Sequence, residues 1–125
     1  MSMSLYVVKA EALMNATVVS YLYLLGAILF EIAGTTSLKL SQGFSRLLPS
    51  IAMFVFYAAS FTLFSFSLKK IDVSTGYAIW SALGTALIAT IGVLYFKEPL
   101  SLLKVVSLAL VVLGVIGLNL SGVEQ

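Results

Sequence analysis

Cysteine and histidine are absent from this sequence of 125 residues, and charged side chains are scarce. Without cysteine there is no disulfide or thiolate metal site. Without histidine there is no imidazole base, no Ser-His-Asp triad and no histidine zinc site. Charged residues make up 10% of the chain, where about 25% is usual, so a soluble fold is excluded. The net charge of +2 is small and the basic residues are scattered, which argues against a nucleic-acid partner.

Hydrophobic residues make up 61% of the chain and fall into four long runs. A membrane-crossing helix needs roughly 20 mostly apolar residues, and each run is long enough. Short polar connectors separate the runs, and Gly43, Pro49 and Pro99 are typical of helix ends. The sequence predicts an all-α membrane protein with four transmembrane helices per chain, over about residues 18–40, 47–68, 74–96 and 102–120. Residues 1–17 are expected to form an N-terminal extension, disordered or a short surface helix, and residues 121–125 a C-terminal tail.

Basic residues are nearly balanced between the two sides of the membrane. The N-terminal side carries Lys9, Lys69 and Lys70, and the opposite side carries Lys39, Arg46, Lys97 and Lys104. Orientation normally follows an excess of Lys and Arg in the cytoplasmic loops, so this balance leaves it almost undecided. Two interpretations stay open, namely a single orientation, or insertion in both orientations with antiparallel pairing.

Glu31 is the only acidic residue deep within any of the four runs. Intramembrane ionisable residues are costly and usually mark ion or substrate pathways. Burial disfavours the charged form, so we expect this carboxyl to hold a proton and to release it to an arriving cation. Small side chains on its helix face are expected to leave space beside it. That face holds Ser20, Leu24, Ala27, Thr35 and Leu38, with Gly34 next to it. The alternative is a neutral carboxyl that serves only as a contact between helices.

One face of the third run is aromatic. Tyr77, Trp80 and Gly84 share this face with the spacing i, i+3 and i+7, and Trp80 is the only tryptophan in the chain. Trp80 lies too deep for the belt that aromatic residues form at membrane interfaces, whereas Tyr77 fits either interpretation. Aromatic faces attract organic cations, by up to about 2 kcal/mol when both are desolvated. A carboxylate and aromatic rings together would form a cage for a lipophilic cation.

The second run offers further side chains to such a cage. Tyr57 and Ser60 carry polar atoms that need partners in lipid, and Phe61 and Phe64 lie on the same side. For the two phenylalanines, packing alone is the stronger interpretation.

Four short motifs resemble those of the small multidrug resistance family, and the similarity covers about residues 20–120. They are EIAGTT at 31–36, KLSQGF at 39–44, PS at 49–50 and YAIWS at 77–81. The resemblance implies proton-coupled export of organic cations by an antiparallel homodimer of dual topology. It implies Glu31 as the shared proton and substrate site, Trp80 and Tyr77 as aromatic walls, and a conformational role for Gly84. The matching positions that line the pocket are Tyr57, Ser60, Thr35, Leu24, Ala27 and Gly34.

Gly34 separates the branches of the family, by the same resemblance. Guanidinium exporters carry tryptophan at this position, so a glycine implies a wider pocket and the branch that exports quaternary ammonium and polyaromatic cations. Ala82 and Asp72 depart from the glycine and proline common at their positions. The first departure puts the flexibility of the third helix in doubt, and the second implies a looser turn.

The fourth run has small residues along one seam and no candidate pathway group. Ser107, Val111, Gly114 and Leu118 form the seam, and Gly117 adds a second small spot. Such a seam predicts a helix–helix interface, between two copies or within one chain, and the resemblance assigns it to the dimer.

Several functions remain open on the sequence. The first is a proton-coupled antiporter for aromatic and quaternary ammonium cations in the bacterial plasma (inner) membrane. The alternatives are a narrow-substrate exporter of guanidinium or polyamines, a non-transporting accessory subunit, or a cation channel. An enzyme is least expected, because Glu31 has no second deep ionisable partner. The expected partners are an organic cation, protons, membrane lipid and a second copy, with no metal or cofactor.

Overall fold

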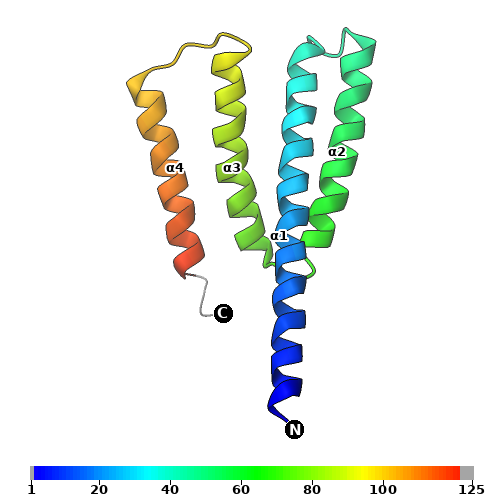
Figure 1. The fold of residues 1–125 in the computed structure, drawn as a ribbon. Helices are drawn as coiled ribbons and strands as arrows, with labels where there is room; N and C mark the ends of the chain where they lie inside the picture. Colours follow the sequence, from blue (N-terminus) through cyan, green and yellow to red (C-terminus); the bar gives the residue numbers. More distant parts are fainter. Residues whose placement is uncertain (1, 122–125) are drawn as a thin grey trace.

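The computed structural model describes residues 2–121, and these form four α-helices and no strand (Figure 1). The helices are α1 (Met3–Leu40), α2 (Leu47–Ser67), α3 (Val73–Leu94) and α4 (Leu102–Ser121). All four are long and apolar enough to cross a membrane, which confirms the predicted four-span, all-α architecture. The bounds of α2, α3 and α4 lie within two residues of those predicted. Of the predicted C-terminal tail, Ser121 ends α4 and the other residues lie outside the described range.

The first helix is longer than the sequence predicts. It begins at Met3 rather than near Val18, so the N-terminal extension and the first span form one continuous helix of 38 residues. Residues 3–18 contain no glycine or proline and several good helix formers, so nothing in them stops a helix that starts in the span. In Figure 1 this part of α1 runs well past the end of the other helices.

The connector between α1 and α2 is a tight, hydrogen-bonded turn. Gln42, Gly43 and Phe44 all have positive φ angles, of 49°, 70° and 65°. The buried hydroxyl of Ser41 donates to the carbonyl of Leu38 and accepts from the backbone N–H of Phe44, so it closes the end of α1. Glycine is the residue best suited to such a φ angle, which explains the break expected at Gly43.

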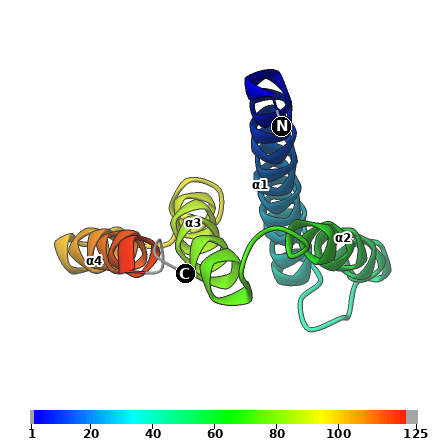
Figure 2. The ribbon, with the colours of Figure 1, turned by 90° about the horizontal axis from the view of Figure 1, so that it is seen from below.

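The helices pack in an open row. Seen along the bundle in Figure 2, α1 and α2 lie together, α3 lies beside them and α4 lies on the far side of α3. The contacts agree, because α1 packs on α2 and α3, whereas α4 packs mainly on α3. The buried core is small, and its main cluster consists of Leu24, Ile28, Ile32 and Ile71. Most other apolar side chains face outward, as expected for a chain whose surroundings are lipid.

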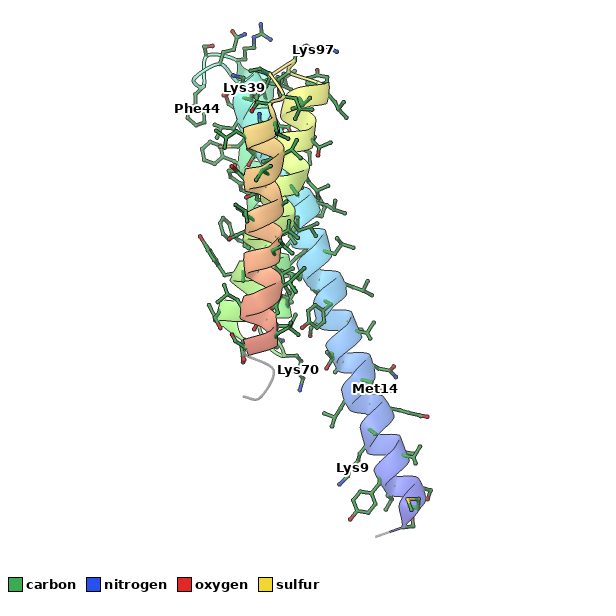
Figure 3. All side chains as sticks on the ribbon, turned by 90° about the vertical axis from the view of Figure 1, so that its left-hand side faces the viewer. Lys9, Met14, Lys39, Phe44, Lys70 and Lys97 are labelled. Atoms are coloured by element: carbon green, nitrogen blue, oxygen red, sulfur yellow. The ribbon has the colours of Figure 1, made fainter. Side chains whose placement is uncertain are left out.

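Charged side chains gather at the ends of the bundle. Figure 3 places Lys39 and Lys97 at one end, Lys70 at the opposite end, and Lys9 farther out along α1. The only ion pair within residues 2–121 joins Lys104 to Glu98, with 3.7 Å between Nζ and Oε1, in the α3–α4 connector region. The ends rich in lysine therefore mark the two faces of the membrane.

Candidate cation-binding site

A cavity of about 440 Å³ lies between α1, α2 and α3. Its wall is mainly aromatic and apolar, and among the described residues only Glu31 brings a charge to it. Helix α1 contributes Glu31, helix α2 contributes Tyr57, Phe61 and Phe64, and helix α3 contributes Tyr77, Trp80, Ser81, Gly84, Thr85 and Ile88. The structure therefore brings the predicted carboxylate and the predicted aromatic stripe to one site.

A chain of hydroxyl groups holds the Glu31 carboxylate. The Thr35 hydroxyl donates a hydrogen bond to Glu31 Oε1 at 2.7 Å, and its oxygen lies 2.7 Å from the Tyr57 hydroxyl. A threonine hydroxyl has one hydrogen, which Glu31 accepts, so Tyr57 must be the donor to Thr35. This relay positions one carboxylate oxygen and connects a cavity-lining tyrosine of α2 to the acid of α1.

The other carboxylate oxygen points toward α3. Glu31 Oε2 lies 3.8 Å from the place that a Cβ on Gly84 would occupy, and Trp80 Cδ1 lies 3.5 Å from the same place. Gly84 is buried and lines the cavity, and its missing side chain lets the acid and the indole come close to the backbone of α3. The proposed conformational role of Gly84 remains a prediction, because the structure describes one state.

Trp80 is held by two phenylalanines of α2. The Phe64 ring meets the indole edge to face with 4.4 Å between centroids, and the Phe61 ring is tilted at 5.6 Å. Such pairs prefer offset or edge-to-face geometry and contribute about 0.5–1.5 kcal/mol each. Both phenylalanines also line the cavity, so they pack and form its wall together. Tyr77 is 63% exposed at the open side of the site.

Gly34 lies directly against the ring of Tyr57. A Cβ on Gly34 would lie 2.5 Å from Cδ1 and Cε1 of Tyr57, which is far inside van der Waals contact. The ring of Tyr57 thus fills the space that the glycine leaves. The missing side chain lets α2 approach α1, Gly34 itself does not line the cavity, and the wider pocket that the resemblance implies stays a prediction.

Three other residues assigned to the pocket are buried between helices and do not line the cavity. Leu24 and Ala27 are almost fully buried, and the Ser60 hydroxyl donates at 2.6 Å to the carbonyl oxygen of Ala27. Ser60 satisfies its polar atom within the α1–α2 contact, as polar groups in lipid must. Leu24, Ala27 and Ser60 therefore contribute to packing between the helices.

Three further residues of α3 line the cavity and were not predicted, namely Ser81, Thr85 and Ile88. They follow Tyr77 at i+4, i+8 and i+11, so the helical period that identified the aromatic stripe would also have found them. Two of the three carry hydroxyl groups, which gives the cavity polar atoms beside the rings.

The predicted seam of α4 is open in this chain. Ser107, Val111, Gly114, Gly117 and Leu118 are all exposed, and apart from the adjoining residues of α4 no atom of residues 2–121 lies within 4 Å of a Cβ built on either glycine. No residue of α4 is buried. Within the part of the chain that the structure describes, these residues therefore do not form the internal contact that the sequence left open.

The chain is similar to known membrane and multidrug resistance proteins. The family described as Small Multidrug Resistance protein matches residues 19–111. Multidrug resistance protein EbrB of Bacillus subtilis is 50% identical over 100 residues, which cover 80% of this chain and 86% of EbrB. Multidrug resistance protein mmr of Mycolicibacterium paratuberculosis is 45% identical over 104 residues, which cover 82% and 97%. Uncharacterized membrane protein YvaE of Bacillus subtilis is 48% identical over 101 residues, which cover 81% and 85%.

The matched region contains Glu31, the hydroxyl relay and the whole cavity. The similar proteins come from bacteria, and the four apolar helices are long enough to span the bilayer. The chain is thus a multi-pass protein of the bacterial plasma membrane, and it belongs to the small multidrug resistance family.

Proposed function

We propose that this protein exports lipophilic organic cations, such as quaternary ammonium compounds, in exchange for protons. The observation that carries the proposal is a single carboxylate in a cavity walled by aromatic rings, with no ion pair to a basic residue in the described part of the chain. A carboxylate supplies the charge that a cation seeks, and the faces of Trp80 and its neighbours supply cation–π attraction. The relatives EbrB and mmr are named multidrug resistance proteins, which supports the same class of cargo.

Protons and cations compete for the same group. A protonated Glu31 has no charge with which to hold a cation, and a bound cation displaces the proton from the carboxyl. The cation is taken up from one side, the protein changes the side on which the cavity opens, and protons from that side expel the cargo. Because one site serves both ions in turn, transport of the cation is linked to movement of protons in the opposite direction.

Two copies in opposite orientations form the transport unit. One chain has a small core and a cavity open at its side, whereas two chains would place two Glu31 carboxyls around one chamber. The open seam of α4, with space beside Gly114 and Gly117, supports a contact between copies. The near balance of basic residues on the two sides of the membrane supports insertion in both orientations.

Transport by reconstituted vesicles tests the proposal. With an inward proton gradient as the only driving force, the wild type is expected to move a bulky aromatic cation, such as tetraphenylphosphonium, against its gradient. Glu31→Gln keeps the size and the hydrogen-bonding capacity of the side chain but removes its charge, and transport should stop. Glu98→Gln makes the same change at an exposed connector carboxylate and should leave transport intact. Undiminished transport by Glu31→Gln would overturn the proposal.

A narrow-substrate guanidinium exporter is the main alternative. The cavity volume and its five aromatic side chains favour a large, apolar cargo, because a small planar ion would contact few of them. Competition between the aromatic cation and guanidinium for the same site distinguishes the two. The proposal requires the aromatic cation to bind more tightly, and the reverse order would favour the alternative.

A further inference from the structure

Helix α1 is too long for the bilayer that the other helices fit. Its 38 residues extend about 57 Å, whereas the hydrocarbon core is about 30 Å thick. The other helices have 20 to 22 residues, which matches the core. Figure 3 shows the excess at one end only, where Met14 and Lys9 lie beyond the end of the bundle.

The point at which α1 leaves the hydrocarbon follows from its contacts with α2. The ring of Tyr23 packs on Phe66, with 5.5 Å between centroids, one residue before α2 ends. Lys69 and Lys70 follow directly in the connector and mark the membrane edge. Residues 3–19 of α1 therefore lie beyond that edge.

The surface of this extension is too apolar to be well solvated by water. Nine large apolar side chains between Met3 and Val19 are 46% to 79% exposed. Ser4, Glu11 and Asn15 form a narrow polar stripe, with the spacing i, i+7 and i+11, and exposed valines flank it on both sides. A helix that projected straight from the membrane would hold this apolar surface in water.

Hydroxyl groups provide a place where the helix can bend. The Thr17 hydroxyl donates to the carbonyl of Leu13, and the Ser20 hydroxyl donates to that of Ala16, both at 3.0 Å. Such bonds to the preceding turn often bend helices. They lie at the membrane edge, which is also where the family match begins, at residue 19.

We propose that residues 3–19 dock on the surface of the bilayer that the protein spans, as an interfacial helix joined to the first span by a bend at Thr17–Ser20. Lipid covers the apolar surface, because the extension emerges directly from the bilayer and needs only a bend in the helix to return to the bilayer surface. Lys9 lies on the apolar side, opposite the polar stripe, and forms no ion pair within the described residues; its long side chain can extend to the phosphates of anionic lipids. The ring of Tyr6 suits the headgroup level, and the polar stripe faces water.

Single-cysteine labelling of the full chain tests the docking, because the natural sequence contains no cysteine. Leu13→Cys and Asn15→Cys place an environment-sensitive fluorophore two residues apart, on nearly opposite sides of the helix. Ser45→Cys, in the exposed α1–α2 connector, provides an aqueous reference, and Leu110→Cys on α4 provides a lipid reference. The labelled proteins are reconstituted into vesicles of phosphatidylcholine and phosphatidylglycerol.

An interfacial helix buries its apolar side by about 5–10 Å, so nitroxide-bearing lipid should quench the Leu13 label several-fold more than the Asn15 label. The Asn15 label should resemble the Ser45 label in its quenching by aqueous iodide. Equal exposure of both labels to iodide would mean a helix projecting into water and would overturn the proposal. A Leu13 label shielded from iodide and from nitroxide lipid, with energy transfer between labelled copies, would mean self-association and would also overturn it.

Discussion

Replacing Gly34 by alanine tests how α1 and α2 shape the site. The added Cβ would lie 2.5 Å from two ring carbons of Tyr57, whereas ordinary carbon contacts are about 3.5–4.0 Å. The ring must therefore move by about 1–1.5 Å. Its hydroxyl, now 2.7 Å from the Thr35 oxygen, would then exceed hydrogen-bonding distance.

The displacement should weaken cation binding. A hydrogen bond contributes about 1 kcal/mol net, which corresponds to about a fivefold change in Kd. We expect Gly34→Ala to weaken binding of a bulky aromatic cation by at least about that factor, because Tyr57 loses both its place in the cavity wall and its support of the Thr35–Glu31 contact. The assay is quenching of Trp80 fluorescence in bilayer discs, with Trp80 as the only tryptophan.

Gly26→Ala is the matched control on the same helix. There the added Cβ would meet only Cδ1 of Leu63 at 3.2 Å, at the flexible end of a side chain away from the cavity. This variant should bind the cation as the wild type does. Wild-type affinity for Gly34→Ala, or an equal loss in both variants, would refute the contact between Gly34 and Tyr57 as a determinant of binding.

Three further substitutions have distinct expected outcomes. Trp80→Leu removes the indole face and should weaken aromatic-cation binding by up to about thirtyfold, the equivalent of about 2 kcal/mol, in an equilibrium-dialysis assay, with Trp80→Phe intermediate. Thr35→Val keeps the shape of the side chain but removes the hydrogen-bond donor to Glu31. The pH at which cation binding is half-maximal should therefore differ from that of the wild type. An unchanged dependence of binding on pH would exclude a role for the relay. Ser60→Ala should lower the unfolding free energy in bilayers by about 1 kcal/mol or less and leave cation affinity unchanged, because its hydroxyl is buried against Ala27 and away from the cavity. Loss of affinity without loss of stability would place Ser60 in the site after all.

The spans and the central site residues could be predicted because they depend on local properties of the chain. Hydrophobic length identifies a membrane helix, and a helical period brings Tyr77, Trp80 and Gly84 to one face wherever that helix packs. Glu31 is distinguished by chemistry alone, as the one acid at that depth.

Other features of the site could not be predicted, because they depend on packing between helices, which the spacing of residues along one helix does not reveal. Thr35 and Ser60 are both hydroxyl residues within spans, yet one supports Glu31 and the other is buried in the α1–α2 contact. Which of them meets the acid depends on the register of α1 against α2. Likewise, the space beside Gly34 is available to a ligand or to a neighbouring ring, and only the position of Tyr57 decides between them.

The exchange of protons for cations at Glu31 is tested most directly by measuring protons released on binding. Purified wild-type protein in weakly buffered solution, near neutral pH and with a pH indicator, receives a saturating bulky aromatic cation. Release of protons is expected from the wild type and from Glu98→Gln, and none is expected from Glu31→Gln. Cation binding to the wild type without proton release, or equal release from Glu31→Gln, would contradict the exchange.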